Sequence, residues 1–322
     1  MPTDLKTLTS LRFFAAFWVF VFHLRSRTDF GEGRVLDFID NGARGVDFFF
    51  ILSGFVILHV YEGEFSRRLF LIKRFARIYP LHALMTLIFI AVAVVAGENP
   101  DGVWQSLLLL HAFDTTHGLV LNGVSWTISA EMFAYLLFAM IPFRQTWLIA
   151  MTCLVTFLAA HALSLSLGKT AFLHLTWDYG AVRIVPLFVL GMLLRRVTPF
   201  ISEMQAVLVG IVGLGLLGWV GSIPNAGYEI LVPFVLLIMA GARLSDWEIV
   251  SNRKPLVYLG EISYSTYMIH FFVITAFFDF LPRLGIPTPH WIVICLVVLA
   301  CSSVSYHLFE VPARRWINAR SG

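Results

Sequence analysis

Charged residues are scarce in this sequence. Asp, Glu, Lys and Arg make up only 13% of its 322 residues, whereas a soluble domain carries about 25%. A water-soluble globular protein is therefore excluded. Hydrophobic residues make up 58%, and no polar stretch is long enough to form a soluble domain. We predict an all-α integral membrane protein with one membrane domain over residues 1–322 and no appended soluble domain.

Cysteine is rare too, and several catalytic motifs are missing. The cysteines are Cys153, Cys295 and Cys301, and their spacing matches no zinc site, so we interpret them as small buried hydrophobic residues and expect no metal. The sequence contains no glycine-rich nucleotide loop and no serine-nucleophile elbow. The net charge of +3 comes from basic residues distributed by topology, which argues against a nucleic-acid partner.

Long apolar runs dominate the sequence. A membrane-spanning helix needs about 20 residues, and ten runs of roughly 17 to 23 residues meet this requirement. The predicted spans are roughly 7–25, 42–60, 78–97, 124–143, 147–165, 178–196, 203–221, 226–243, 258–281 and 289–310. The shorter run 103–113 is interpreted as an amphipathic or re-entrant segment. These runs predict a polytopic bundle of about ten transmembrane helices.

The distribution of Lys and Arg predicts the orientation of this bundle. Of the 23 basic residues, 16 fall on the side that both termini share and seven on the other; Arg144 and Arg253 are among the 16. The richer side is cytoplasmic by the positive-inside rule. Both termini are therefore predicted to be cytoplasmic, in a multi-pass protein of the cell (inner) membrane.

The first span contains LRFFAAFWVFVFHL, in which only Arg12 and His23 are ionisable. Eleven residues of α-helix turn by about 1100°, so both side chains lie on one face, about 16 Å apart along the axis. Ionisable groups inside a membrane mark a pathway or a site by default. The alternatives are an interfacial anchor for Arg12 and a core histidine for His23. Asp47, at a similar depth in span two, is expected to orient His23 or to pair with Arg44.

A basic segment, SRRLFLIKRFARIYPLH, follows span two. Lys73 and Arg77 are four residues apart and share a helical face, with Arg74 beside them. The cluster can orient the protein by contacting anionic lipid. It can also bind phosphate on the cytosolic side, because the planar guanidinium bonds phosphate oxygens in pairs. Both interpretations stay open.

Span four, NGVSWTISAEMFAYLLF, carries an acid within the membrane. Glu131 has Tyr135 one turn further along the same face, and Trp126 lies at the interface. A buried carboxylate needs a partner, and Arg183 in span six is predicted at a similar depth. A purely structural ion pair is the alternative to a functional one.

Span nine, EISYSTYMIHF, carries a polar stripe. Ser263, Tyr267 and His270 recur at i, i+4 and i+7, so the stripe faces a cavity or another helix. Interhelical packing is the alternative role. The candidates for substrate binding are Trp126 and Tyr135 of span four, Arg183 of span six, and Tyr267 and His270 of span nine.

Seven motifs link the sequence to a known family. They are LTSLRFFAAFWVFVFH, GVDFFFILSGFVI, RFARIYPLH, SWTISAEMFAY, RIVPLFVLGMLL, ISYSTYMIH and FEVPARRW. In this order, over about residues 12–316, they resemble the bacterial acyltransferase family 3 membrane proteins. The resemblance implies transfer of an acyl group, commonly acetyl, from acyl-coenzyme A to hydroxyls of sugars on surface or secreted glycans. Some members of the family modify small molecules such as macrolides.

The resemblance also implies roles for individual residues. It implies that Arg12 and His23 lie in the active centre. It also implies that Arg74 and Arg77 bind the donor phosphates and that Glu131 lies in the membrane cavity. The family motif of span four often has two adjacent acids, and here Met132 replaces the second. Glu131 is therefore expected to act alone.

The expected mechanism follows from these positions. Cytosolic acyl-coenzyme A rests on the basic segment, and its pantetheine arm reaches into the bundle. His23, whose ordinary imidazole pKa is about 6.5, acts as general base on an acceptor hydroxyl. Glu131 or Asp47 stabilises the imidazolium, and Arg12 binds the donor phosphate or carbonyl. Direct transfer is favoured, because no serine is placed beside the base.

Two other functions are compatible with intramembrane charges. A transporter or flippase of lipid-linked glycan moves its substrate without consuming a donor. A non-catalytic partner in a glycan-assembly complex does not depend on the face shared by Arg12 and His23. Donor hydrolysis with and without His23 distinguishes these functions from an acyltransferase.

Overall fold

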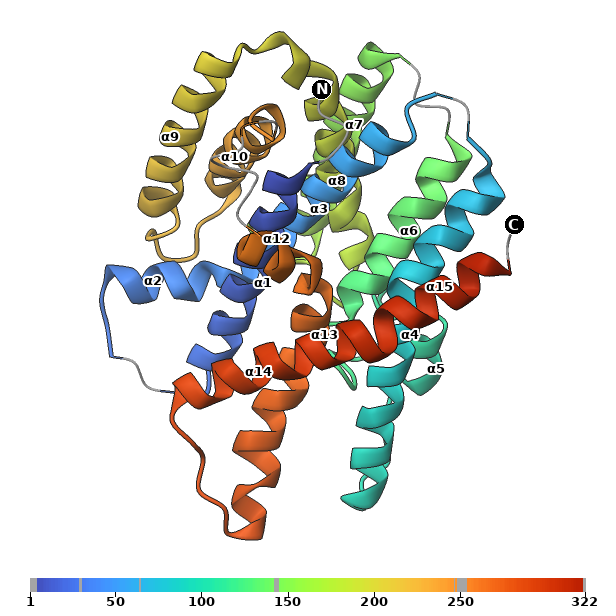
Figure 1. Cartoon of the computed structure of the whole chain (residues 1–322), viewed down its shortest axis with the longest axis vertical. Helices are drawn as coiled ribbons and strands as arrows, with labels where there is room; N and C mark the ends of the chain where they lie inside the picture. The colour runs from blue at the N-terminus through green and yellow to red at the C-terminus, as the bar shows by residue number, and fades with distance from the viewer. Residues whose placement is uncertain are drawn as a thin grey trace. The chain divides into compact units, whose positions relative to one another are not determined.

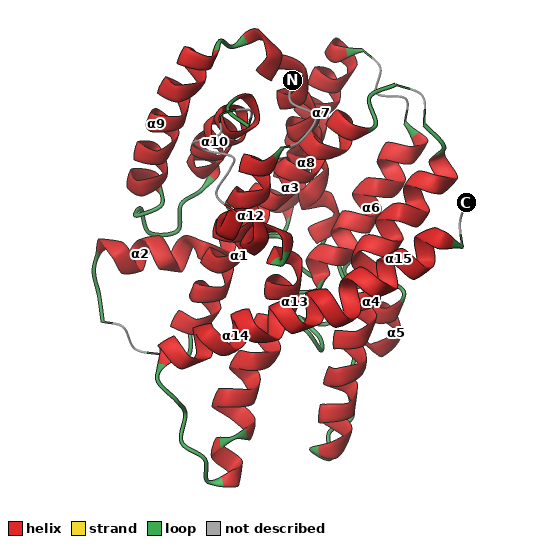
Figure 2. Cartoon of the chain, viewed as in Figure 1, coloured by secondary structure: helices red, strands yellow, loops and turns green. Residues whose placement is uncertain are grey.

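Every regular element is a helix in the part of the chain that the structure describes. The structure is a computed structural model, and it describes residues 5–28, 31–63, 65–141, 145–245, 247 and 254–320. Figure 2 shows helices joined by loops, with no strand among these residues. The all-α prediction is therefore confirmed.

Seven helical segments are long and apolar enough to cross a membrane. Four are single helices: α1 (Lys6–Arg25), α4 (Arg67–Val95), α7 (Thr146–Ser166) and α9 (Glu203–Val220). Three are composite: α2 (Arg34–Asp40) with η1 (Asn41–Arg44) and α3 (Gly45–Val60), α13 (Ser263–Thr275) with η5 (Ala276–Phe280) and η6 (Pro282–Leu284), and α14 (Trp291–Ser305) with η7 (Tyr306–Glu310) and α15 (Val311–Ala319). These segments establish the membrane environment.

The three other predicted spans form helices that are shorter or more charged. α6 (Trp126–Met140) has 15 residues and α10 (Leu231–Arg243) has 13. α8 (Gly180–Val197) has 18 residues, three of them arginine. The count of about ten spans and the cytoplasmic position of both termini therefore stay predictions. Arg144, Arg253 and the end of the predicted span 124–143 lie outside the described residues.

The chain divides into two compact units, each described here by itself. Unit 1 comprises Met1–Gly63, Phe143–His174 and Val185–Ser263, and unit 2 comprises Glu64–Pro142, Leu175–Ile184 and Tyr264–Gly322. Figure 1 colours the chain from the N- to the C-terminus and labels its helices. The chain passes between the units several times, and α8 divides between them. A single membrane domain over residues 1–322 stays a prediction.

Two glycines let α3 and α8 pack in close contact in unit 1. A Cβ on Gly54 would lie 1.8 Å from the Phe188 carbonyl oxygen, and one on Gly191 would lie 1.8 Å from the Ile51 carbonyl oxygen. Small residues allow membrane helices to approach this closely. The close approach of α3 and α8 therefore depends on both glycines.

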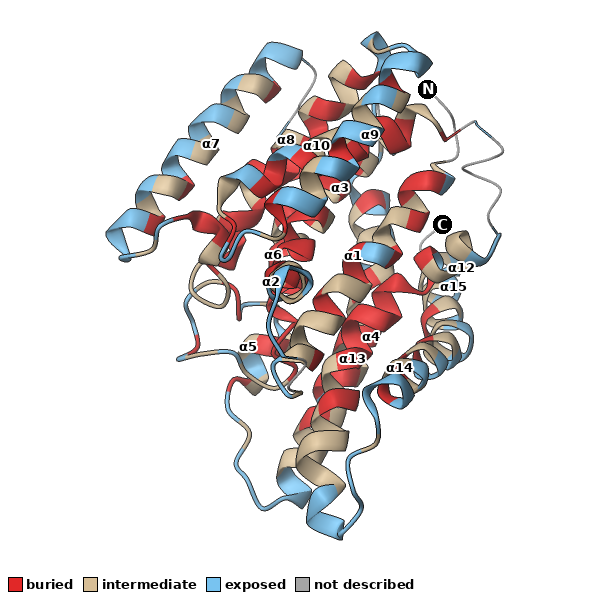
Figure 3. Cartoon of the chain, turned by 90° about the vertical axis from the view of Figure 1, so that its left-hand side faces the viewer, coloured by how far each residue is buried: buried red, intermediate tan, exposed pale blue. Residues whose placement is uncertain are grey.

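The outer faces of α7 and α9 are apolar, which suits contact with lipid. Figure 3 shows α7 largely exposed. Only Ile149, Ala160 and Ser164 of α7 are buried, whereas Leu158 of α7 and Trp219 of α9 are exposed. Apolar side chains cost little free energy against hydrocarbon, so these helices form the periphery of unit 1.

Three helix irregularities lie in unit 2. The 29-residue helix α4 contains Pro80, η5 is a π-helical turn after α13, and η7 is a π-helical turn between α14 and α15. π-Helical turns often occur at functional sites. The predicted re-entrant run 103–113 holds only the short helix α5 (Val103–Leu107).

Candidate active site

α1 is one continuous helix, so it carries Arg12 and His23 as the sequence predicted. Both side chains are half-buried. His23 Nδ1 lies 2.9 Å from the Val19 carbonyl oxygen, one turn earlier. Because a carbonyl only accepts, Nδ1 carries the hydrogen, and the lone pair of the neutral ring is on Nε2. The backbone of α1 therefore sets the tautomer that a base acting through Nε2 requires.

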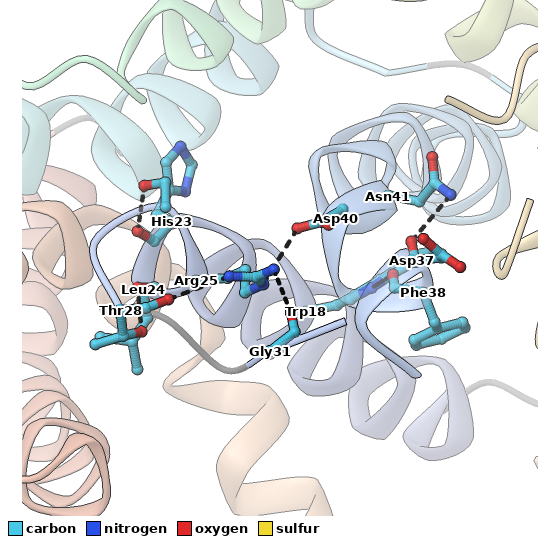
Figure 4. Close-up of polar contacts among 11 residues, drawn as sticks. Trp18, His23, Leu24, Arg25, Thr28, Gly31, Asp37, Phe38, Asp40 and Asn41 are labelled. Atoms are coloured by element: carbon cyan, nitrogen blue, oxygen red, sulfur yellow. Dashed lines mark hydrogen bonds and ion pairs between the residues drawn. The ribbon is translucent and has the colours of Figure 1, made fainter. Parts of the chain in front are cut away.

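Contacts with the following loop and α2 fix the end of α1 that carries His23 (Figure 4). Arg25 donates to the Gly31 carbonyl at 2.9 Å and lies 3.8 Å from the Asp40 carboxylate. Trp18 donates to the Phe38 carbonyl at 2.7 Å, and their rings stack at 4.7 Å. These contacts limit the movement of the last turns of α1.

Asp47 lies in the first turn of α3 and is fully buried. A carboxylate there is stabilised by the positive end of the helix dipole. Arg44, in the preceding turn, donates to the carbonyls of Leu173 at 2.8 Å and Ala226 at 3.1 Å. Arg44 thus holds two loops of unit 1 around the start of α3. The role of Asp47 in orienting His23 stays a prediction.

Three predicted site residues meet in unit 2. The Tyr135 hydroxyl donates to the carboxylate of Glu131, which lies one turn away on the same face of α6. The Arg74 guanidinium of α4 lies over the Tyr135 ring, 5.9 Å from its centroid. A cation at this distance is attracted by the ring quadrupole. One tyrosine therefore contacts both the predicted donor-binding arginine and the predicted intramembrane acid.

Arg77 forms a buried ion pair. Its Nη1 lies 3.3 Å from the Glu310 carboxylate, which also accepts a 2.9 Å hydrogen bond from Ser265. Glu310 is 2% exposed and ends the π-helical turn η7. The sequence analysis included Glu310 only within the closing motif FEVPARRW and gave it no role. Its position inside a family motif was the one signal that pointed to it.

Arg183 is buried against Trp126. Its guanidinium lies 5.3 Å from the Trp126 ring centroid, and Nη1 donates to the Leu175 carbonyl at 3.0 Å. A Cβ on Gly180 would lie 2.5 Å from the Trp126 ring, so glycine is needed there. The predicted ion pair of Arg183 with Glu131 stays a prediction.

Tyr267 and His270 of the polar stripe of span nine are buried within unit 2, whereas Ser263 is the last residue of unit 1. The Tyr267 hydroxyl donates to the Val124 carbonyl at 3.0 Å and accepts from Thr127 at 3.1 Å. His270 is fully buried, and its Nδ1 lies 3.3 Å from the carbonyl one turn earlier. The hydrogen bonds of Tyr267 place this part of the stripe against the start of α6.

Comparison with known proteins identifies the family. The family description "Acyltransferase domain", Acyl_transf_3, matches residues 5–307. The chain belongs to the acyltransferase family 3. This acyltransferase is similar to Acyltransferase MdmB of Streptomyces mycarofaciens, with 28% identity over 309 residues, 84% of this chain and 79% of that protein.

A second relative of the acyltransferase is longer. O-acetyltransferase OatA of Staphylococcus aureus is 25% identical over 365 residues, which cover 98% of this chain and 58% of OatA. The chain thus spans a little over half the length of OatA. No solved structure matches the chain.

The acyltransferase also contains a histidine pair that the sequence analysis missed. His82 of α4 and His111 of the following loop are 0% and 2% exposed, and their rings stack with centroids 5.6 Å apart. The helical patterns could not find this pair because His111 lies in an irregular loop. Among the residues that the structure describes, no three His, Cys, Asp or Glu side chains form a metal-binding group.

Proposed function

We propose that this acyltransferase moves an acyl group from cytosolic acyl-coenzyme A to a sugar hydroxyl, and that the acyl group is acetyl. The acceptor is a surface or secreted glycan, and the enzyme lies in the cell (inner) membrane. The family and the O-acetyltransferase relative support this proposal. Its central observation is the hydrogen bond from His23 Nδ1 to the Val19 carbonyl, because it leaves the lone pair on Nε2.

The donor phosphates bind to Lys73, Arg74 and Arg77 in this proposal. Lys73 is exposed, while Arg74 and Arg77 are half-buried. The ion pair with Glu310 occupies only part of the hydrogen-bonding capacity of Arg77, because a guanidinium has five N–H donors. One edge of the guanidinium can stay on the carboxylate while another bonds a phosphate oxygen. Arg12 binds the donor phosphate or the thioester carbonyl.

The acceptor hydroxyl gives its proton to His23 Nε2. The hydroxyl oxygen attacks the acyl carbonyl carbon, and coenzyme A leaves as a thiolate that later takes up a proton. Either Asp47 or Glu131 stabilises the imidazolium that forms at His23. Trp126, Tyr135, Arg183, Tyr267 and His270 are the proposed substrate-binding residues. A general base of this kind contributes about 10²- to 10⁴-fold to the rate.

A donor-consumption assay tests this function. His23→Ala in purified protein should lower acetyl transfer from acetyl-coenzyme A by about 10²-fold or more. His161→Ala is a matched control, because His161 lies on α7 and hydrogen-bonds the Tyr228 hydroxyl at 2.9 Å. Full activity of the His23 variant would refute His23 as base. Substrate movement without donor consumption would favour the transporter alternative.

A small-molecule acceptor such as a macrolide is a second candidate. It follows from the known range of the family. Incubation of the enzyme with acetyl-coenzyme A and either a glycan fragment or a macrolide separates the two acceptors by mass spectrometry.

A further inference from the structure

The loop before α6 places a serine beside a histidine in unit 2. Ser125 Oγ lies 3.1 Å from His111 Nε2, and His111 Nδ1 lies 3.3 Å from the Gln105 carbonyl oxygen. Because the carbonyl only accepts, Nδ1 carries the hydrogen and Nε2 accepts from the serine hydroxyl. Nucleophilic catalysis uses a nucleophile, a base beside it and a group that orients the base. Ser125, His111 and the Gln105 carbonyl have this arrangement.

The protonation state of His111 fits a base. Burial lowers the pKa of His111 from its ordinary value, so the ring is neutral at pH 7. The first turn of α6, which begins directly after Ser125, directs its backbone N–H groups towards this end of the helix. Such groups stabilise negative charge developing on a carbonyl oxygen.

Two further polar atoms beside the pair are unsatisfied. His82, stacked on His111, donates from Nε2 to the Ser106 carbonyl at 2.9 Å. His82 Nδ1 and the Ser106 hydroxyl are buried and have no hydrogen-bond partner within the described part of the chain. Buried polar atoms in folded proteins nearly always have partners. Two such atoms at one place indicate a site for a polar group of a ligand.

Backbone strain concentrates in the same region. Four of the five non-glycine residues with positive φ in the described ranges belong to unit 2: Leu109, Asp114, Leu121 and Tyr179. A left-handed conformation is unfavourable at a non-glycine residue and tends to occur at functional sites. Leu109 and Asp114 flank His111 in the sequence.

We propose that Ser125 is an acyl-carrying nucleophile, with His111 as its base, so that transfer proceeds through an acyl-serine ester. This inference rests on the proposed function and replaces its direct step with two steps. His82 and Ser106 bind the polar part of the thioester. The sequence analysis favoured direct transfer because no serine is placed beside His23, whereas the structure places Ser125 beside His111.

Each step balances. Ser125 Oγ attacks the thioester carbonyl carbon, its proton passes to His111 Nε2, and the C–S bond breaks to release the coenzyme A thiolate. The acceptor oxygen then attacks the ester carbonyl and gives its proton to His23, the base of the proposed function. The His111 imidazolium returns its proton to Ser125 Oγ as the C–Oγ bond breaks. The thiolate takes up a proton from solvent, and His23 releases one.

The proposed donor site and Ser125 lie in the same unit. Arg74 contacts Tyr135, and ten residues of α6, about 15 Å, separate Tyr135 from Ser125. The phosphates of coenzyme A and its thioester lie at opposite ends of the long pantetheine arm. A donor held at Arg74 therefore extends along α6 towards Ser125.

An isotope-exchange experiment tests the acyl-serine. Full-length protein in detergent is incubated with acetyl-coenzyme A and radiolabelled free coenzyme A, without acceptor. An acyl-enzyme moves label into acetyl-coenzyme A, and peptide mapping should locate an acetyl group on Ser125. We expect Ser125→Ala and His111→Gln each to lower the exchange by about 100-fold. Ser129→Ala is the matched control, because Ser129 is equally buried one turn along α6 and donates to the Leu109 carbonyl.

The outcomes separate this inference from the proposed function. Acetyl transfer to an acceptor without exchange, an acetyl group on another residue, or wild-type exchange by Ser125→Ala would each overturn the acyl-serine alone. A wild-type protein that consumes no donor would overturn both. If Ser125→Ala fails to fold, Ser125→Cys decides: its acetyl group should become labile to neutral hydroxylamine, and no change in lability would overturn the inference.

Discussion

Arg77 of α4 and the buried carboxylate of Glu310 in η7 form an ion pair at 3.3 Å, joining residues 233 positions apart in the sequence. The Ser265 hydroxyl bonds the other carboxylate oxygen at 2.9 Å. This pair ties the proposed donor-binding segment to the C-terminal helices of unit 2. It gives Arg77 a defined position before any donor binds.

Removing one partner of this pair should destabilise the protein. Glu310→Gln leaves the Arg77 charge without its carboxylate, and we expect a loss of about 3–5 kcal/mol. Thermal unfolding in detergent measures the loss. The double variant Arg77→Gln with Glu310→Gln should lose less than the sum of the single variants. If the losses in the free energy of unfolding of the two single variants add up to that of the double variant, Arg77 and Glu310 have no coupling free energy.

The basic segment should recognise the phosphates of the donor. Arg74→Ala with Arg77→Ala should raise the KM for acetyl-coenzyme A about tenfold or more, because each charge-assisted bond contributes about 1.5–3 kcal/mol. Acetyl-pantetheine lacks the nucleotide phosphates, so its KM should not change. Equal effects on both donors would assign the arginines a structural role. Arg283→Ala, on a turn outside the segment, is the control.

The crossing of α3 and α8 should not tolerate a side chain. Gly54→Ala places a Cβ 1.8 Å from the Phe188 carbonyl oxygen, so the helices must separate, and we expect loss of folded protein in size-exclusion chromatography. Gly215→Ala is the matched control. Its Cβ meets nothing within 4 Å, and alanine favours the helix by about 1 kcal/mol. Equal yields of both variants would contradict the close packing.

Stability should depend on pH through His111. Burial lowers its pKa in the folded state, so the unfolded state binds the extra proton first. The stabilisation is complete above the unfolded value of about 6.5 and is lost as pH falls through the window below it. The unfolding temperature of the wild type should fall from pH 8 to pH 5.5 more than that of His111→Gln. Parallel curves would contradict a buried neutral ring.

The helical elements and several site pairs were predictable because their information is local. The spacing of Glu131 and Tyr135 predicted that they share one face of a helix, and the structure adds the hydrogen bond between them. The continuous helix carrying Arg12 and His23 followed from an apolar run of span length. The backbone bond that sets the His23 tautomer was not predicted, although its acceptor lies one turn away, because the partner expected for the ring was a carboxylate.

Contacts between distant segments were not predictable. No sequence pattern linked Arg77 to Glu310. Arg77 lies in a basic segment and Glu310 at the end of an apolar run, and each had several possible partners of opposite charge. Arg183 was expected near Glu131, but its stacking on Trp126 depends on the absence of a side chain at Gly180. His111 was missed because loop conformation depends on long-range packing rather than on periodicity.

The sequence by itself determined the membrane environment, the helical class and the family, and it supplied the candidate residues for acyl transfer, because hydrophobicity, helical period and motif order are read along the chain. Only the tertiary structure decided which of these residues meet. Side chains from α4, α6, α13 and η7 come together by packing of helices far apart in sequence, and the buried pair of Ser125 with His111 exists because an irregular loop folds back onto the start of α6.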